Sequence, residues 1–242
     1  MRETARTTLR LATLGAALAL AAAAGAQPPV PEAGGIESEH DGGNTEGERV
    51  EALALEGDPV RGEEAYAVCS ACHLPSGSGR PDGTFPQLAG QHATVLIKQI
   101  ADIRAGRRDN PIMYPFAITL TDPQELADVA AYLQTLPIPP GNGKGPGTNL
   151  PEGEQLYRRD CVQCHGDRGQ GDAREFYPVL AGQHYEYLLR QIRDIAARRR
   201  RNANPDMVKV VQGYRDAQLQ AVADYVSHLR WPERPSQAGG GS

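Results

Sequence analysis

The chain is poor in sulfur and lacks patterns that would point to several other classes of protein. It has four cysteines and three methionines in 242 residues, and no cysteine lies outside two short motifs, so none is left for a structural disulfide elsewhere. No segment alternates apolar and polar residues as a half-buried β-strand does, which favours an all-α fold. The net charge is only −5, and this mild acidity argues against general nucleic-acid binding.

Residues 1–26 are predicted to be a cleavable signal peptide. Three arginines precede an apolar run at 11–24, and Ala24-Gly25-Ala26 has the small-residue pattern of a cleavage site. The run is short against the roughly 20 residues of a membrane-spanning helix, although an uncleaved anchor stays an alternative. We therefore expect export to a bacterial periplasm, a location that also allows peripheral association with the membrane.

Both cysteine motifs read C-x-x-C-H, at residues 69–73 and 161–165. This is the attachment signature of c-type haem, in which two thiols form thioethers to the porphyrin and the next residue places an imidazole under the iron. A disulfide or half of a zinc site would also use C-x-x-C, but zinc-finger pairs lie much closer together than these motifs do. Two covalently bound haems c are thus predicted. The attachment residues would be Cys69, Cys72, Cys161 and Cys164, and the axial histidines His73 and His165.

The motifs belong to two related halves. The block F-P-Q-L-A-G-Q-H at 85–92 returns at 177–184 as Y-P-V-L-A-G-Q-H, with the same shift of 92 residues that relates the motifs. Self-similarity of this length indicates a duplicated domain, and a segment rich in proline and glycine separates the copies. The predicted organisation is a signal peptide at 1–26, a disordered acidic spacer at 27–50, a first domain at 51–138, a linker at 139–150, a second domain at 151–235 and a disordered tail at 236–242.

Each half is predicted to be helical. In the first half, capping residues and apolar spacing place helix starts at Asp58, near His92 and at Asp122, where Glu125 would complete a capping box. The copy of the second helix starts near His184. The last helix of each half carries apolar residues at helical spacing, so one face of it should be buried in the core.

Each iron needs a sixth ligand or an open site. Met113 and Met207 lie 40 and 42 residues after the motif histidines, one in each half, and this matching position favours them as axial ligands. His92 and His184 are the rival pair, but they begin a helix too close in sequence to reach around the porphyrin, so we interpret them as helix-start or propionate-side residues. Lys209 lies close enough to Met207 to compete at high pH. Methionine–histidine ligation raises the reduction potential and fills both axial positions, which favours an electron carrier over a catalyst.

With these motifs the sequence resembles the dihaem cytochrome c4 family, in which two class I cytochrome c domains follow each other in tandem. The resemblance covers residues 51–232 and depends on the C-x-x-C-H pair, the P-x-L-A-G-Q block and the late methionine of each half. It implies that the carbonyls of Pro86 and Pro178 accept a hydrogen bond from the axial imidazoles. It also implies that the first and last helices of each half cross through a glycine and aromatic residues. These are Gly62, Tyr66 and Tyr132, and Gly153, Tyr157 and Tyr225.

The resemblance implies a periplasmic electron-transfer protein with no catalytic residues, either a monomer or a loose dimer. The expected donor is a quinol–cytochrome c reductase or a dehydrogenase, and the expected acceptor is a terminal oxidase such as a haem–copper oxidase. One alternative is the electron-accepting dihaem subunit of a periplasmic dehydrogenase, for example a flavin-containing sulfide dehydrogenase. A dihaem peroxidase would need an iron with an open or displaceable ligand, which two axial methionines disfavour.

The charge is not spread evenly along the chain. Acidic residues dominate 27–138, whereas basic residues slightly exceed acidic ones in 151–235, and such asymmetry would orient the molecule in the field of a charged partner. The basic run Arg198–Arg201 has two interpretations. It could be the solvated last turn of a helix, where cations suit the helix dipole, or a patch that docks an acidic partner or screens haem propionates.

Overall fold

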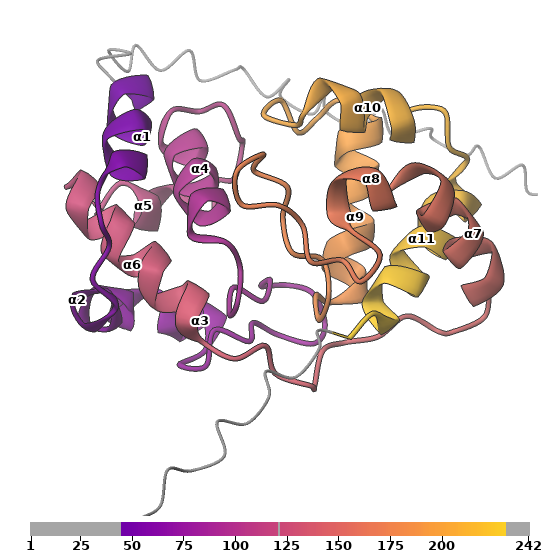
Figure 1. Cartoon of the computed structure of the whole chain (residues 1–242), viewed down its shortest axis with the longest axis horizontal. Helices are drawn as coiled ribbons and strands as arrows, with labels where there is room; N and C mark the ends of the chain where they lie inside the picture. The colour runs from indigo at the N-terminus through magenta and orange to yellow at the C-terminus, as the bar shows by residue number, and fades with distance from the viewer. Residues whose placement is uncertain (1–44, 121, 231–242) are drawn as a thin grey trace, which may run out of the picture. The chain divides into compact units, whose positions relative to one another are not determined.

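The structure is a computed structural model that describes residues 45–120 and 122–230, all of which lie in one compact unit. Within these ranges the protein is all-α, as predicted, and the only strand-like pairing is an isolated bridge between Asp172 and Tyr177 (Figure 1). The predicted signal peptide, most of the predicted spacer and the whole predicted tail fall outside the described residues. Among the helices that the structure does describe, none is long and apolar enough to cross a bilayer.

The two halves repeat the same order of helices. The first half contains α1 (Thr45–Ala54), α2 (Pro59–Ala65), a 3₁₀ turn η1 (Tyr66–Val68), α3 (Ser70–His73), α4 (Ala93–Arg104), α5 (Tyr114–Ala117) and α6 (Pro123–Thr135). The second contains α7 (Leu150–Asp160), α8 (Val162–His165), α9 (Tyr185–Ala196), α10 (Pro205–Val211) and α11 (Asp216–His228). Helix α1 has no copy in the second half within this order.

The helix starts follow from local capping. The carboxylates of Asp58 and Asp122 accept hydrogen bonds from the backbone N–H two residues on, at 2.8 and 2.9 Å, and a proline follows each of them. The expected capping box with Glu125 is wrong, because the Asp122 carboxylate is bonded to the N–H of Gln124 instead. The remaining predicted helices, α4 and α9, begin directly after His92 and His184.

Helix α1 corrects the predicted disordered spacer, because its first six residues, 45–50, lie inside the range assigned to that spacer. One small residue anchors the helix, since Ala52 is 1% exposed and packs with the core of the first half. Glu48 also forms an ion pair with Arg104 of α4. These contacts join positions about fifty residues apart, so a search for local hydrophobic periodicity does not detect them.

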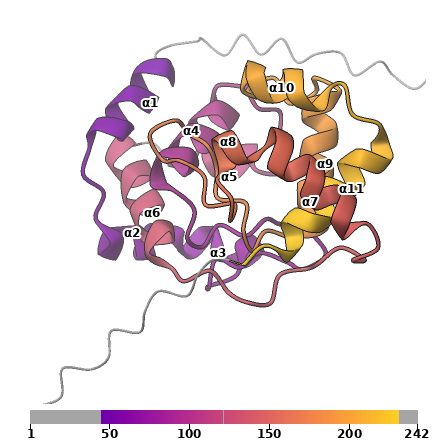
Figure 2. The same cartoon turned by 45° about the vertical axis from the view of Figure 1, so that its right-hand side comes forward.

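In each half the helix before the haem motif lies across the last helix, α2 on α6 and α7 on α11 (Figure 2). Both crossings have a glycine at the contact, as the resemblance implied. A Cβ atom on Gly62 of α2 would lie 2.0 Å from the backbone oxygen of Asp128 in α6, and one on Gly153 of α7 would lie 2.1 Å from that of Ala221 in α11. Tyrosine pairs flank both crossings, with ring centroids 5.5 Å apart in the first half and 5.6 Å in the second. The cores under these crossings contain Leu126, Val129, Ala130 and Leu133 in one half and Leu219, Val222, Ala223 and Val226 in the other.

The segment between the halves is held along the second half. The Asn142 side chain donates to the backbone carbonyls of Gln183 and Ser227, at 3.0 and 2.8 Å. The backbone N–H groups of Gly145 and Gly147 donate to side chains of α11, the Ser227 hydroxyl and the Asp224 carboxylate. The linker is therefore bound in place by hydrogen bonds over this stretch.

Candidate haem sites

In the first half, the loop that follows the motif fixes His73 at the end of α3. The side chain is buried, and its Nδ1–H donates to the carbonyl oxygen of Pro86 at 2.9 Å, the bond that the resemblance implied. Burial lowers the pKa of His73, although the Pro86 carbonyl acts in the opposite direction, and this lowering favours the neutral ring. Its Nε2 is buried and has no hydrogen-bond partner among the described residues. A neutral imidazole with a free, buried Nε2 lone pair is what an iron ligand requires.

The second half repeats this arrangement at His165, the last residue of α8. Its Nδ1 lies 3.2 Å from the carbonyl oxygen of Pro178, and burial again lowers its pKa. An aromatic ring lies against each imidazole, with Phe85 at 6.0 Å from His73 and Tyr177 at 6.2 Å from His165, measured between centroids.

The cysteines of each motif share one helical turn with the histidine. The backbone N–H of His73 donates to the carbonyl of Cys69 at 3.0 Å, and that of His165 to the carbonyl of Cys161 at 2.9 Å. None of the four cysteines is paired in a disulfide. Burial raises the pKa of Cys69 to about 11 and that of Cys161 to about 12, unlike the low-pKa thiolates of C-x-x-C oxidoreductases. In the described ranges, no three histidine, cysteine or acidic side chains come together in a way that could hold a metal ion.

The two methionines have different surroundings. Met113 is half-buried in the loop that caps α5, where its backbone N–H is bonded to the Asn110 side chain at 3.2 Å. Met207 lies inside α10 and packs against the core of the second half. Lys209 is exposed and pairs with Asp206 at 2.8 Å.

His92 and His184 begin helices, which confirms the helix-start interpretation, and their rings also reach the opposite half. Nε2 of His92 lies 2.9 Å from the carbonyl oxygen of Gln170, and Nε2 of His184 lies 2.8 Å from that of Ser78. Both histidines therefore have an interface role that the sequence does not predict. His184 also accepts from the linker N–H of Gly143 at 3.0 Å, and burial lowers its pKa.

The glutamine before each histidine makes the same kind of contact, which the sequence analysis missed. The Gln91 side chain accepts from the N–H of Val179 at 2.9 Å and donates to its carbonyl at 3.0 Å. The Gln183 side chain accepts from the N–H of Gln87 at 3.0 Å and donates to its carbonyl at 2.9 Å. We name this set of four hydrogen bonds the glutamine clasp. The available signal was the Gln-His pair itself, which is repeated with the shift of 92 residues although it belongs to neither haem motif.

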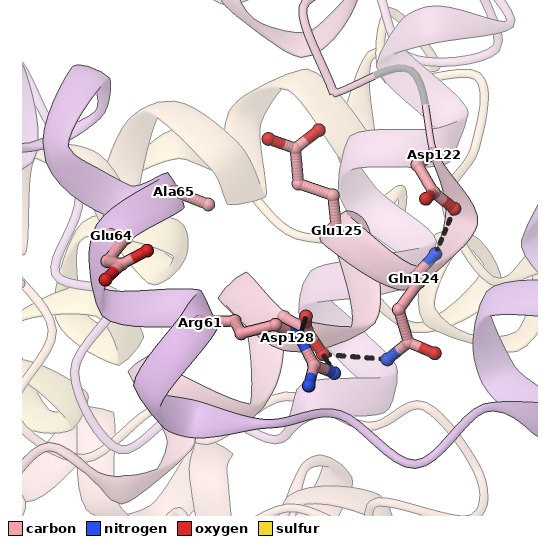
Figure 3. A pocket seen from close by; sticks show the side chains of 7 residues that line it. All are labelled: Arg61, Glu64, Ala65, Asp122, Gln124, Glu125 and Asp128. Atoms are coloured by element: carbon pink, nitrogen blue, oxygen red, sulfur yellow. Dashed lines mark hydrogen bonds and ion pairs between the residues drawn. The ribbon is translucent and has the colours of Figure 1, made fainter.

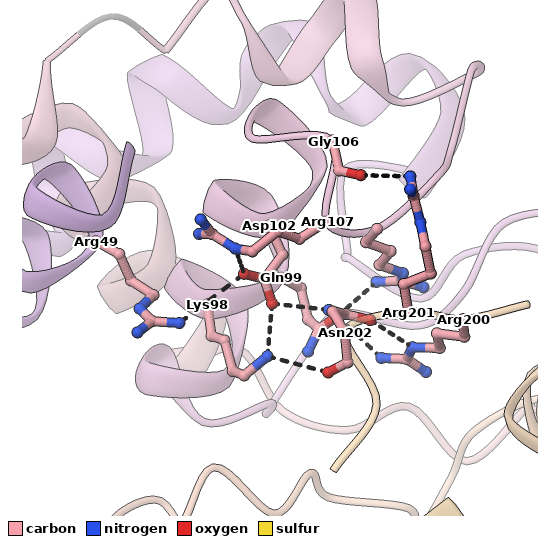
Figure 4. A network of polar contacts seen from close by, with 10 residues as sticks. Arg49, Lys98, Gln99, Asp102, Gly106, Arg107, Arg200, Arg201 and Asn202 are labelled. Carbon is pink, nitrogen blue, oxygen red and sulfur yellow. Dashed lines mark hydrogen bonds and ion pairs between the residues drawn. The ribbon is translucent and has the colours of Figure 1, made fainter. Parts of the chain in front are cut away.

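The basic run Arg198–Arg201 follows α9 rather than forming its last turn, and it is only partly a solvated surface. Arg200 and its copy in the first half, Arg108, each donate to both Gln99 and Gln191, at 2.9 to 3.1 Å. Burial and the neighbouring Arg108 lower the pKa of Arg200 to about 10. Arg201 also reaches the first half, where it donates to the carbonyl of Gly106 (Figure 4).

Asp102 is the buried anion of this same region. It is 1% exposed and accepts hydrogen bonds from Lys98 at 2.5 Å, Arg107 at 2.8 Å and, across the interface, Asn202 at 2.8 Å (Figure 4). Burial opposes ionisation of the carboxyl, but these hydrogen bonds outweigh it and lower the pKa. The network therefore joins the halves and neutralises part of the positive charge that the arginines bring together.

A surface pocket of about 400 Å³ lies apart from both motifs. Its lining includes Arg61, Glu64 and Glu125, and Figure 3 shows Arg61 and Gln124 both turned toward Asp128. Asp128 is buried and receives hydrogen bonds from Arg61 and from the N–H of Asp58, so it ties the start of α2 to α6. No residue of either haem motif lines this pocket. We interpret it as a surface groove between the crossing helices α2 and α6, with a structural role.

The residues of both motifs fit a covalently attached haem. Paired cysteines share one turn with a neutral, buried imidazole that is oriented by a proline carbonyl, and the buried Nε2 of His73 has no other partner. The fold and these two sites define a protein with two c-type cytochrome domains in tandem.

Comparison with known proteins agrees with this class. The cytochrome c family model matches residues 59–137 and 150–230. A cytochrome c4 of Thiocapsa roseopersicina is 36% identical, over 72% of this chain and 93% of that protein. The thiosulfate dehydrogenase electron acceptor of Stutzerimonas stutzeri is 32% identical, over 73% and 90%. The crystal structure of reduced cytochrome c4 from Pseudomonas stutzeri is similar with a TM-score of 0.66 and 30% identity, over 72% of this chain and all of that one.

The chain belongs to the dihaem cytochrome c4 family and carries two covalently bound haems c. It is thus an electron-transfer cytochrome.

Proposed function

We propose that this protein is a periplasmic carrier that takes one electron on each haem, from a quinol–cytochrome c reductase or a dehydrogenase, and delivers it to a terminal oxidase or another acceptor. The observation that carries the proposal is the repeated, buried environment of His73 and His165, each held by a proline carbonyl. Such a site keeps the ligand geometry fixed while the charge on iron changes, as electron transfer requires.

We propose the following roles for the site residues. Cys69 and Cys72 attach the first haem, and Cys161 and Cys164 the second. His73 with Met113, and His165 with Met207, would be the axial pairs, with Pro86 and Pro178 orienting the imidazoles. Two filled axial positions leave no open coordination site on iron, which supports a carrier rather than a peroxidase.

A redox titration of the full-length holoprotein followed by optical spectroscopy tests these assignments. A methionine–iron charge-transfer band should accompany both oxidised haems. Met113→His should remove the band of the first haem and lower its potential, because a second imidazole stabilises ferric iron better than a thioether does. An unchanged spectrum in Met113→His, or strong carbon monoxide binding by the reduced wild type at neutral pH, would contradict the axial assignment.

A second candidate function is that of dedicated electron acceptor for a periplasmic dehydrogenase of sulfur compounds. The relative from Stutzerimonas stutzeri, named as the electron acceptor of thiosulfate dehydrogenase, favours this candidate over other dehydrogenase partners. Stopped-flow reduction of the holoprotein separates the two. Reduction by thiosulfate dehydrogenase much faster than by the quinol–cytochrome c reductase would favour the dedicated acceptor, and the reverse order would favour the general carrier.

We also infer that residues 1–26 are removed on export. The apolar run and the A-x-A site support this. N-terminal sequencing of the protein from a periplasmic fraction should begin at Gln27, and a start at Met1 in the membrane fraction would instead identify an anchor.

A further inference from the structure

The glutamine clasp ends on the two peptide groups that orient the proposed axial histidines. The N–H that Gln183 accepts from belongs to Gln87, and the same peptide group contributes the Pro86 carbonyl that accepts from His73. Because a peptide group is planar and conjugated, its N–H and C=O are linked both rigidly and electronically. The side-chain oxygen of Gln183, the peptide group 86–87 and Nδ1 of His73 thus form one continuous hydrogen-bonded chain, with bonds of 3.0 and 2.9 Å.

The same chain exists in the opposite direction. Gln91 of the first half accepts from the N–H of Val179 at 2.9 Å, and this peptide group contributes the Pro178 carbonyl that accepts from His165 at 3.2 Å. Each glutamine therefore acts on the half to which it does not belong. The two arrangements are equivalent, since Gln91 and Gln183 are copies of each other, as are the positions of Gln87 and Val179.

Burial strengthens the hydrogen bonds of this chain. Gln87, Gln183 and His73 are 6%, 7% and 3% exposed, so water does not compete strongly for their polar groups. In such surroundings, hydrogen bonds in a chain polarise one another, and a carbonyl whose N–H is bonded becomes a better acceptor. The second bond of each glutamine, from Nε2 to the carbonyl of the clasped residue, fixes the side chain so that its oxygen faces the N–H.

We propose that Gln183 is a positioning residue for His73 and that Gln91 is a positioning residue for His165, so that each half sets the electron affinity of the haem in the other. The proposal rests on the proposed axial role of these histidines. A stronger Nδ1–H bond gives the imidazole more anionic character, and this stabilises ferric iron and lowers the reduction potential. Loss of one glutamine should therefore raise the potential of the haem in the opposite half.

The test uses redox titration of the full-length holoprotein and of Gln183→Met and Gln91→Met, which keep the side-chain length but remove the amide donor and acceptor. Gln183→Met should raise the potential of the haem at residues 69–73 and leave the other unchanged, and Gln91→Met should do the reverse. The equilibrium constant for electron sharing between the haems should shift several-fold, in opposite directions. The loss of the charge-transfer band in Met113→His identifies the first haem.

Gln87→Ala is the matched control, because it removes a side chain at the same contact and keeps the backbone N–H and C=O that Gln183 binds. It should leave both potentials unchanged. In NMR spectra, the Nδ1–H resonance of His73 should move in Gln183→Met and not in Gln87→Ala, a readout that mere loss of stability would not give. If a methionine variant does not assemble, the asparagine variant, whose amide is one methylene too short to reach, is titrated in its place.

The crossed pattern distinguishes the proposal from its alternatives. A shift confined to the half that carries the substitution, equal shifts of both haems, or no shift would overturn it. A wild type that lacks the methionine–iron band would count against the proposed axial pairs. The absence of crossed shifts with that band present would count against the clasp alone.

Discussion

The two halves of the protein are alike around the haem motifs and differ at their outer elements. Both use a proline carbonyl for the motif histidine and a tyrosine hydroxyl that closes the motif turn, from Tyr66 to the carbonyl of Leu74 at 2.9 Å and from Tyr157 to that of Gly166 at 2.6 Å. Helix α1 and the buried Asp128 stabilise the first half, whereas the second has Ala221 at the position of Asp128 and the bound linker along α11. The two copies of the domain have thus kept the contacts around the haem motif and the contacts between the halves.

The methionine segments show where the halves have diverged most. The segment around Met113 exposes apolar side chains, since Ile112, Phe116 and Ile118 are 62%, 36% and 43% exposed. The segment around Met207 forms a seven-residue helix that packs on the core of its half. The segment of the proposed ligand Met113 therefore exposes more apolar surface than the segment of Met207 does.

The largest expected effect comes from disrupting the helix crossing at a glycine, which both halves share. Gly62→Ala and Gly153→Ala would each place a Cβ atom within 2.1 Å of a backbone oxygen at the helix crossing. Because the backbone must move to relieve this overlap, we expect each variant to lose about 3 kcal/mol of unfolding free energy. Denaturant unfolding and haem content measure the effect.

Gly213→Ala is a suitable control for these variants, since nothing lies within 4 Å of a Cβ added there. If Gly62→Ala were as stable as Gly213→Ala, the close crossing of α2 and α6 would be wrong.

The second prediction concerns Asp102, a buried carboxylate whose copy in the second half, Asp194, is not buried. Asp102→Asn should cost about 2 kcal/mol at neutral pH, because charge-assisted hydrogen bonds are lost from a buried site. The pKa of Asp102 is lowered in the folded state, so its stabilisation is complete above the ordinary carboxyl pKa of about 3.9 and is lost as the pH falls through the folded value. The stability gap between wild type and variant should therefore close on acidification.

The copy of Asp102 supplies the control. Asp194 pairs with Arg199 at the surface, with a side chain 30% exposed, so Asp194→Asn should change the stability far less. A gap for Asp102→Asn that stays constant down to pH 2 would contradict the ionised, bonded state of this carboxyl.

The third prediction exploits a backbone difference in the motif turn. Leu74 has φ +64° and ψ 154°, a backbone region nearly confined to glycine that costs another residue about 1–3 kcal/mol, whereas its copy is Gly166 with φ +76°. Gly166→Ala should lose about 1–3 kcal/mol of unfolding free energy, because alanine disfavours this region and its Cβ would lie 2.2 Å from the Gln170 side chain. Leu74→Gly should gain less than this, because the half-buried leucine side chain is lost. Thermal unfolding of the pair gives the comparison, and a loss in Leu74→Gly larger than that in Gly166→Ala would contradict it.

The sequence predicts what depends on neighbours along the chain. The caps at Asp58 and Asp122 and the helix starts after His92 and His184 follow from local or repeated patterns, whereas the glycine crossings were implied by the family resemblance. It does not predict helix α1, whose stability comes from Ala52 and Glu48 in contact with distant helices. The interface roles of the glutamine clasp and of Arg200 were missed for the same reason, because their partners lie about ninety to a hundred residues away.

The smallest expected effect concerns His184, one of the two interface histidines. His184 is buried, accepts from the N–H of Gly143 and donates to the carbonyl of Ser78, so protonation of its Nδ1 would break the bond to the linker. Burial lowers its pKa in the folded state, although Asp82 acts in the opposite direction. Its stabilisation is therefore present above the ordinary histidine pKa of about 6.5 and is lost as the pH falls through the folded value. Hydrogen exchange of the Gly143 amide should accelerate relative to that of Gly145 as the pH is lowered through this range, after correction for intrinsic rates. Equal changes at both amides would place the acid-sensitive group elsewhere.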